Sequence, residues 1–259
     1  MMMAGAARAD ATLDKIKQQG RIVIGVMISG GQFGSIDPAT QRFTGWNPEL
    51  ARDLARKLGV ELEAVQVLSG NRVQLLQAGK VDALIASMEL NEARAEILGY
   101  APTPHYRVGG SAVVPKRSGI QRWEDLRDKP VCLSQGSSYA KPLAEQYGAQ
   151  VKGFKTSSES LLALRGGNCV AAVHDGILIH PLLRGNAEWA DYAAPLPELI
   201  PAPSVIWVRK GETDTAAAID KVVQQWHRSG WLIETEKRLG IAPASPLLAE
   251  LHAQLKGRR

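Results

Sequence analysis

Three groups of polar residues in this 259-residue chain have the types and positions needed to hold a small charged ligand. Arg94 follows a turn that begins at Asn91, and an arginine fork can hold a carboxylate through two parallel hydrogen bonds. Asp175 ends an apolar run and is a candidate partner for an ammonium group. The segment 135–138 (Gln-Gly-Ser-Ser) offers backbone N–H and hydroxyl donors for an anion, although helix capping explains its serines equally well. Together these groups predict a carboxylate pocket and an ammonium pocket, as a free amino acid requires.

Motifs for catalysis and metal binding are missing from the sequence. It contains no H-E-x-x-H, G-x-x-x-x-G-K-[ST] or G-x-S-x-G pattern, and the histidines lack the spacing of metal ligands. Residues 138–141 (Ser-Tyr-Ala-Lys) match the S-x-x-K signature of penicillin-recognising enzymes, but its S-D-N and K-T-G partners are absent. We interpret that match as accidental and expect no catalytic residue, metal ion or cofactor.

Alternating strands and helices must position these polar groups. The β-branched run at residues 21–26 predicts a buried strand. Asn47 and Pro48 have the types expected at the cap and first position of a helix, which Gly59 would end. Residues 60–64 then alternate between apolar and acidic side chains, as a strand does. A strand, a helix and a strand joined by short connections predict a parallel α/β sheet.

An internal similarity divides the chain. Residues 76–87 align without a gap to residues 164–175, and in each copy a helix that ends at glycine leads into an apolar strand. The two strands end at polar residues, Ser87 and Asp175. Open α/β sheets bind ligands at the carboxyl ends of their strands, so the two copies predict two lobes that face one site.

The predicted lobes have the following boundaries. Lobe 1 comprises residues 10–105 and 205–259, and lobe 2 comprises residues 110–200. The chain crosses between them near residues 105–109 and 200–204, and two crossings predict a hinge that closes around a ligand. We expect the helical residues after position 216 to pack on lobe 1.

Composition excludes several classes of protein. Thirty-one basic and 26 acidic residues give a formal net charge of +5, which is too small to indicate nucleic-acid binding. No apolar run approaches the roughly 20 residues that a membrane span requires. Residues 7–9 (Ala-Arg-Ala) have the form of a signal-peptidase site, and we interpret them as the end of a trimmed secretory signal. The two cysteines, Cys132 and Cys169, fit one disulfide or two buried thiols.

Four runs of sequence resemble the polar amino-acid family of periplasmic solute-binding proteins, the capture subunits of ABC importers. Residues 43–59 (Phe-Thr-Gly-Trp-Asn-Pro-Glu-Leu-Ala through Leu-Gly) look like the family's l-x-G-F-D-x-D-l-a run, and residues 71–82 look like N-R-I-x-x-L-x-x-G-k-v-D. Residues 89–94 resemble T-x-T-x-x-R, and residues 123–137 resemble l-x-D-L-k-g-k-x-V-x-x-x-x-G-[ST]. The resemblance implies an α/β, two-lobed periplasmic-binding-protein fold of type II, in which each lobe is a mostly parallel sheet flanked by helices and two strands form the hinge.

The resemblance also assigns roles to residues. Arg94 corresponds to the arginine that holds the ligand α-carboxylate, Ser137 supports that carboxylate, and Asp175 takes the α-ammonium. Arg72 stands where acidic-amino-acid members hold a side-chain carboxylate, and His174 stands where some members contact the side chain. The remaining residues that we assign to the site are Ser87, Glu89, Trp46, Gly136 and Ser138.

Departures from the family pattern leave the ligand's side chain open. Met27 and Gly30 replace a polar and an aromatic residue of the family, and Glu89 replaces the first threonine of T-x-T-x-x-R. Glu89 could point away, pair with Arg72, or favour a cationic or amide side chain. We slightly favour glutamate or aspartate as ligand, and pairing of Glu89 with Arg72 would weaken that case.

From these considerations we expect a monomeric, periplasmic binding protein that delivers an amino acid to an ABC permease in the inner membrane and binds no nucleic acid. An extracytoplasmic setting favours a Cys132–Cys169 disulfide over free thiols. The alternatives are a dehydratase of the cyclohexadienyl type on the same scaffold, with Glu89 as general acid, and the sensing domain of a regulator or receptor.

Overall fold

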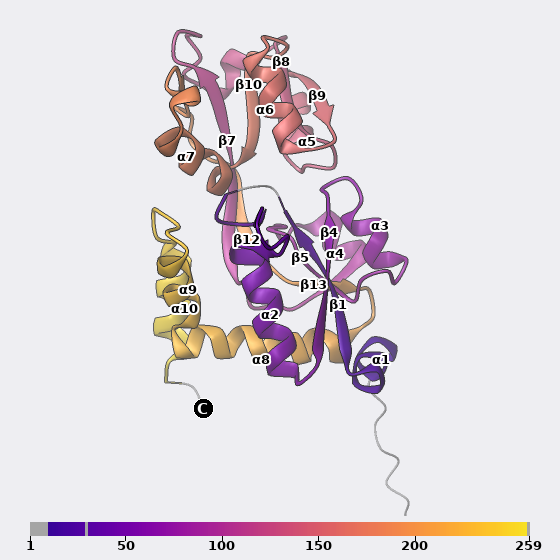
Figure 1. Cartoon of the computed structure of the whole chain (residues 1–259). Helices are drawn as coiled ribbons and strands as arrows, with labels where there is room; N and C mark the ends of the chain where they lie inside the picture. The colour runs from indigo at the N-terminus through magenta and orange to yellow at the C-terminus, as the bar shows by residue number, and fades with distance from the viewer. Residues whose placement is uncertain (1–9, 29–30, 258–259) are drawn as a thin grey trace, which may run out of the picture.

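A computed structural model describes residues 10–28 and 31–257 as two α/β lobes, one above the other in Figure 1. The proposed signal remnant at residues 7–9 and the departure at Gly30 lie outside the described residues. Within the described ranges, no helix combines the length and apolar character that a membrane crossing requires.

The lower lobe in Figure 1 is built on a five-stranded sheet in the order β4-β1-β5-β13-β6. Strand β1 runs parallel to β4 along its whole length and parallel to β5 on its other side, as the strand–helix–strand pattern predicts. Strand β13, which follows the return of the chain from the upper lobe, is antiparallel to β5 and β6 and completes the sheet. The strands are β1 (Arg21–Met27), β4 (Glu61–Val67), β5 (Ala83–Ile85), β6 (Leu98–Tyr100) and β13 (Trp207–Arg209).

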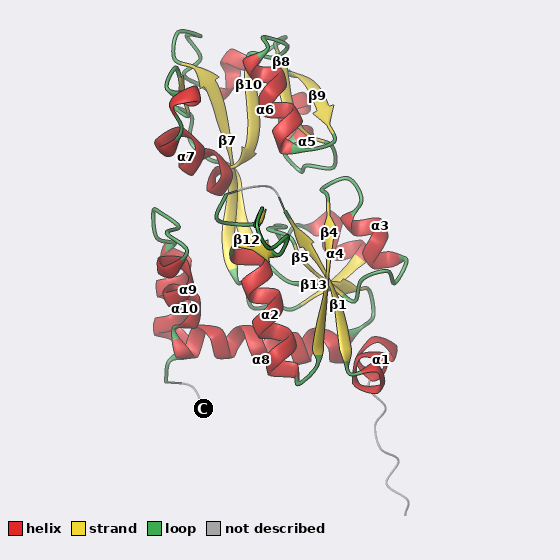
Figure 2. Cartoon of the chain, in the orientation of Figure 1, coloured by secondary structure: helices red, strands yellow, loops and turns green. Residues whose placement is uncertain are grey.

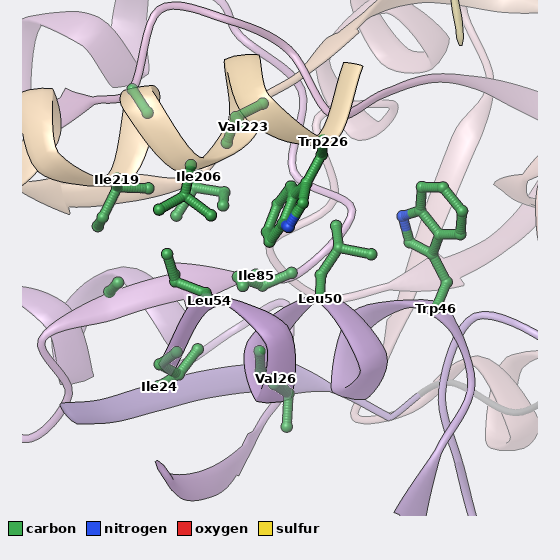
Figure 3. Packing of buried hydrophobic residues seen from close by; sticks show 14 of the residues in the cluster. Ile24, Val26, Trp46, Leu50, Leu54, Ile85, Ile206, Ile219, Val223 and Trp226 are labelled. Carbon is green, nitrogen blue, oxygen red and sulfur yellow. The ribbon is translucent and has the colours of Figure 1, made fainter. Parts of the chain in front are cut away.

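Helices cover this sheet, and the C-terminal ones close its core. Trp226 of α8 is buried together with Ile24 of β1 and Leu54 of α2, so the last part of the chain packs on the first (Figure 3). This packing agrees with the expectation for residues beyond 216. The helices and the small hairpin of this lobe are α1 (Ala11–Gln19), β2 (Ser35–Ile36), β3 (Phe43–Thr44), α2 (Trp46–Leu58), α3 (Arg72–Gln77), α4 (Glu92–Ile97), α8 (Thr213–Ser229), α9 (Trp231–Arg238) and α10 (Pro246–Leu255).

The start of α2 corrects one prediction. The helix begins at Trp46 with Gly45 as its cap, so Asn47 lies inside the first turn and is not the cap. Asn47 is buried, and its amide nitrogen donates to the Met27 carbonyl and to the Ser87 hydroxyl, both at 3.3 Å. Its side chain therefore ties the helix to the ends of two strands. The helix ends at the left-handed Gly59, as predicted.

The upper lobe contains a second sheet, in the order β11-β7-β10-β8-β9, with β12 also paired to β7. Strands β8, β9 and β10 are parallel, whereas β7 is antiparallel to β10, so the sheet is mixed. Its elements are β7 (Tyr106–Pro115), a 3-10 turn (Trp123–Leu126), β8 (Pro130–Ser134), α5 (Ala140–Glu145), β9 (Gln150–Phe154), α6 (Ser157–Arg165), β10 (Ala171–Asp175), α7 (Gly176–Gly185), a 3-10 turn (Ala187–Trp189), β11 (Tyr192–Ala193) and β12 (Leu199–Ser204).

Strands β7 and β12 connect the lobes. They pair antiparallel from Tyr106 opposite Ser204 to Gly110 opposite Leu199, and they run side by side through the narrow region between the lobes (Figure 2). Two adjacent strands of this kind form a hinge that can bend without breaking either core.

A disulfide joins Cys132 and Cys169 in the upper lobe, which confirms the expected bridge. Cys132 lies on β8, and Cys169 precedes β10, which pairs with β8. The bond therefore links neighbouring parts of one sheet, and both cysteines are buried.

Candidate functional site

A cavity lies between the two lobes and is lined by side chains from both. The lower lobe contributes the loop after β4, the start of α3 and the residues that follow β5. The upper lobe contributes the loop after β8, residues 155–157 and the end of β10. These are carboxyl ends of strands, the position at which α/β sheets bind ligands. Most polar lining residues carry hydroxyl groups: Ser69, Ser87, Ser134, Ser137, Ser138, Tyr139, Thr156 and Ser157.

Arg72 and Asp175 place opposite charges in this cavity from opposite lobes. Arg72 is 5% exposed, and its Nη1 donates to the Ala86 carbonyl at 3.0 Å. Burial, with Arg94 nearby, lowers the pKa of Arg72 to about 10, so the guanidinium remains protonated at neutral pH. Among the described residues, Arg72 forms no ion pair within 4 Å.

Tyr139 holds the Asp175 carboxylate in place. Its hydroxyl donates to Oδ1 of Asp175 at 2.6 Å. Burial raises the pKa of Asp175 to about 6, although the Tyr139 hydrogen bond and the charge of Arg72 act in the opposite direction. Burial and the Asp175 charge raise the pKa of Tyr139. The carboxylate is thus a desolvated anion at pH 7, which an incoming cation would stabilise.

Glu89 is paired with Arg94. The distance from Arg94 Nη1 to Glu89 Oε1 is 2.6 Å, and the same Nη1 donates to the Glu89 carbonyl at 3.0 Å. Asn91 caps α4 by accepting from the Arg94 backbone N–H, which fixes the start of this short helix. Burial raises the pKa of Glu89, but the Arg94 charge and hydrogen bonds from Arg94 and Ser138 outweigh it, so its pKa lies below the usual value. Glu89 lines the cavity, whereas Arg94 does not.

Other residues assigned from the sequence also line the cavity. Ser87 has a φ of +47°, unusual for a residue other than glycine, and its hydroxyl bonds to Asn47. His174 is buried, with Nε2 2.8 Å from the Ser160 hydroxyl, and burial lowers its pKa to about 4. Ser137 and Ser138 reach the cavity from the upper lobe.

The structure does not place Trp46 or Gly136 among the lining residues. Trp46 is fully buried in the lower core, where its indole N–H donates to Nδ1 of His105 at 3.4 Å. Gly136 instead brings the lobes together. A Cβ on this residue would lie 2.5 Å from the Ser69 carbonyl oxygen of the other lobe, and its φ of +76° favours glycine. In this structure Trp46 supports the core, and Gly136 permits the lobes to approach.

Sequence reasoning missed Tyr139 and Ser69. Tyr139 stands in the S-x-x-K match, and nothing in its spacing points to Asp175, which lies 36 residues further along the chain. Ser69 precedes Asn71-Arg72 and offers only its type as a signal.

Comparison with known proteins identifies the family of this chain. Residues 22–240 match the model of the bacterial extracellular solute-binding proteins, family 3. The chain belongs to this family. A glutamine-binding protein of Geobacillus stearothermophilus is 31% identical over 183 residues, which cover 69% of this chain and 70% of the relative. An ABC transporter glutamine-binding protein of Bacillus subtilis is 27% identical over 232 residues, or 88% of this chain and 84% of the relative.

Solved structures agree in fold. The crystal structure of a cysteine-binding protein from Campylobacter jejuni has a TM-score of 0.82 and 27% identity, and the match covers 88% of this chain and 92% of that one. Family 3 members of this kind are two-lobed binding proteins of the type II periplasmic fold that serve amino-acid ABC transporters, and this chain shares that fold.

Proposed function

We propose that this family 3 protein captures a free polar amino acid in the cavity between its lobes and delivers it to an ABC permease. The observation that carries the proposal is the pair of opposite charges, Arg72 from one lobe and Asp175 from the other, in one cavity. A zwitterion carries the complementary pair, so its carboxylate would meet a guanidinium and its ammonium would meet Asp175. The hydroxyl groups around them would bind a polar side chain.

Ligand-stabilised closure follows from this division of the site. A ligand that bridges Arg72 and Asp175 makes both contacts only when the lobes are together, so it binds the closed state more tightly than the open one. The close contact between Gly136 and the Ser69 carbonyl marks how near the lobes come. A permease that recognises the closed arrangement would then receive only loaded protein.

The names of the relatives and of the family support an ABC permease as partner and a location outside the cytoplasm. Two of them are named for glutamine, one of these as a component of an ABC transporter, and the matching family is described as extracellular. We therefore propose a periplasmic monomer that acts with an inner-membrane ABC permease. The predicted slight preference for glutamate or aspartate stays a prediction.

The proposal includes no chemical step. A dehydratase on this scaffold would need a protonated acid in the cleft, and Glu89 was the candidate. Its ion pair with Arg94 lowers its pKa and keeps it ionised at neutral pH, which disfavours that role. Turnover of prephenate or arogenate by the purified protein would overturn this part of the proposal.

A thermal-shift screen of the natural amino acids tests the function. The protein should first be unfolded and refolded, to remove any ligand retained from the host. A ligand present at about 1,000 times its dissociation constant adds about 4 kcal/mol to the free energy of unfolding, which for this length means a shift of several degrees. The absence of a shift with every amino acid would refute the proposed function.

A further inference from the structure

Arg94, the arginine expected to hold the ligand carboxylate, already has a carboxylate. Its Nη1 lies 2.6 Å from Oε1 of Glu89, and the two side chains are only 12% and 6% exposed. Glu89 lines the cavity and Arg94 does not, so Glu89 is the member of this pair that faces the ligand space. A charge pair held this close, largely out of water, is stronger than the exposed ion pairs of the surface.

Arg72 is the buried guanidinium that remains available. It lines the cavity, and its one hydrogen bond among the described residues runs to the Ala86 carbonyl. The other cation on the lining is Lys155, which is exposed and therefore well hydrated. A carboxylate in the cavity thus gains most from Arg72, where a guanidinium is already desolvated and lacks an ion-pair partner within the described part of the chain.

Direct binding of a ligand carboxylate to Arg94 would require displacement of Glu89. The displaced carboxylate would remain beside the cavity, where Glu89 and Asp175 already repel each other, since the charge of Glu89 contributes to the raised pKa of Asp175. A buried carboxylate that loses its partner is strongly destabilised. Exchange of one carboxylate for another at Arg94 therefore offers little gain.

Resting on the proposed amino-acid binding, we propose that Glu89 is an internal carboxylate that occupies Arg94, and that Arg72 receives the carboxylate of the ligand. The buried charges that remain for the ligand are then one guanidinium and one carboxylate, Arg72 and Asp175. Glu89 thereby determines specificity: the site selects amino acids with one carboxylate over those with two. This inference opposes the slight preference for glutamate or aspartate predicted from the sequence, which assigns the α-carboxylate to Arg94 and the side-chain carboxylate to Arg72.

The first test compares Glu89→Gln with Glu96→Gln, measured by calorimetric titration with glutamine, glutamate, asparagine and aspartate. Both substitutions remove one negative charge near α4, but Glu96 is exposed and outside the cavity. In Glu89→Gln the released Arg94 can accept a second carboxylate. The affinity for glutamate relative to glutamine, or for aspartate relative to asparagine, should rise at least about tenfold, the effect of one charged hydrogen bond. Glu96→Gln should leave both ratios unchanged.

The second test compares the two arginines. Arg72→Gln should weaken binding of the preferred amino acid by about 100-fold. The double variant Glu89→Gln/Arg94→Gln removes both members of the pair together, so neither is left as a newly unpaired buried charge, and it should weaken binding of neutral amino acids at least about tenfold less than Arg72→Gln does. Retained binding in Arg72→Gln with loss in the double variant would overturn the inference, as would unchanged ratios in Glu89→Gln.

These results separate the inference from the function on which it rests. If the wild type binds amino acids and either comparison fails, only the assignment of the two arginines is wrong. If neither the wild type nor any variant binds an amino acid, the proposed function is wrong and the inference falls with it.

Discussion

Replacement of Asp175 by Asn should weaken ligand binding and at the same time stabilise the empty protein. Burial raises the pKa of this carboxyl from 3.8 to about 6, even with the Tyr139 hydroxyl and the Arg72 charge nearby. At 1.36 kcal/mol for each pKa unit, the buried anion destabilises the empty fold by about 3 kcal/mol at pH 8. An asparagine keeps an oxygen for the Tyr139 hydrogen bond and carries no charge.

The direction of the stability change with pH follows from the raised pKa of Asp175. Below about pH 3 the carboxyl is protonated in both the folded and the unfolded state, so the substitution should change stability little there. As the pH rises from about 4 to about 6, the unfolded state ionises before the folded state does, so the wild type loses stability through this group and Asp175→Asn does not; above about pH 6 the difference stays constant. Urea unfolding of ligand-free protein should therefore show a stability gain of up to about 3 kcal/mol at pH 8 that disappears near pH 3.

Ligand binding should change in the opposite direction. The ammonium of the ligand loses its buried ionic partner, which corresponds to about 2–5 kcal/mol, or at least roughly 30-fold in the dissociation constant. Calorimetric titration with the amino acid identified by the thermal-shift screen measures this change in the dissociation constant. A variant that is less stable than the wild type at pH 8, or that retains full affinity, would refute the reasoning about this carboxylate.

Three further outcomes are expected. Gly136→Ala should weaken binding at least about tenfold, because the new methyl group meets the opposite lobe. Gly167→Ala, with the same φ of +76° and open space around it, should leave the affinity unchanged. Calorimetric titration of both variants distinguishes an effect on closure from backbone strain. Replacement of Cys132 and Cys169 by Ala should lower the free energy of unfolding by about 4 kcal/mol, the chain-entropy value for a separation of 37 residues. Urea unfolding measures this change, and the affinity for the ligand should change no more than a few-fold. Affinity should be constant above pH 7 and fall about tenfold per unit below pH 6 as Asp175 is protonated, and a flat profile to pH 4.5 would contradict this.

The sequence predicted the architecture well because local signals agree with the global fold. The β-branched run at 21–26, the glycine at 59 and the alternation at 60–64 correspond to β1, the end of α2 and the start of β4. The hydrophobic period and the conformation of glycine depend on neighbouring residues in the sequence, so they can be predicted without knowledge of the tertiary contacts. Ser87 and Asp175, chosen because they end the repeated strands, both line the cavity.

Side-chain partners across the cleft were less predictable. The three options for Glu89 did not include Arg94, although Arg94 lies only five positions further along the chain. The pairing depends on the backbone turn that α4 makes at Asn91, which brings the two side chains together. Trp46 was assigned to the site from its place in a family motif, but its large apolar surface gains more from burial against Phe33 and Tyr106.

The central claim, that Arg72 and Asp175 hold a zwitterion between the lobes, is tested most directly by one calorimetric comparison. The preferred amino acid is titrated beside two analogues, the amine that lacks its carboxylate and the acid that lacks its ammonium. The account predicts one site per chain for the amino acid and a loss of at least about 100-fold for each analogue. If either analogue bound as tightly as the amino acid, the opposite charges of the cavity would not be the basis of recognition, and the claim would be contradicted.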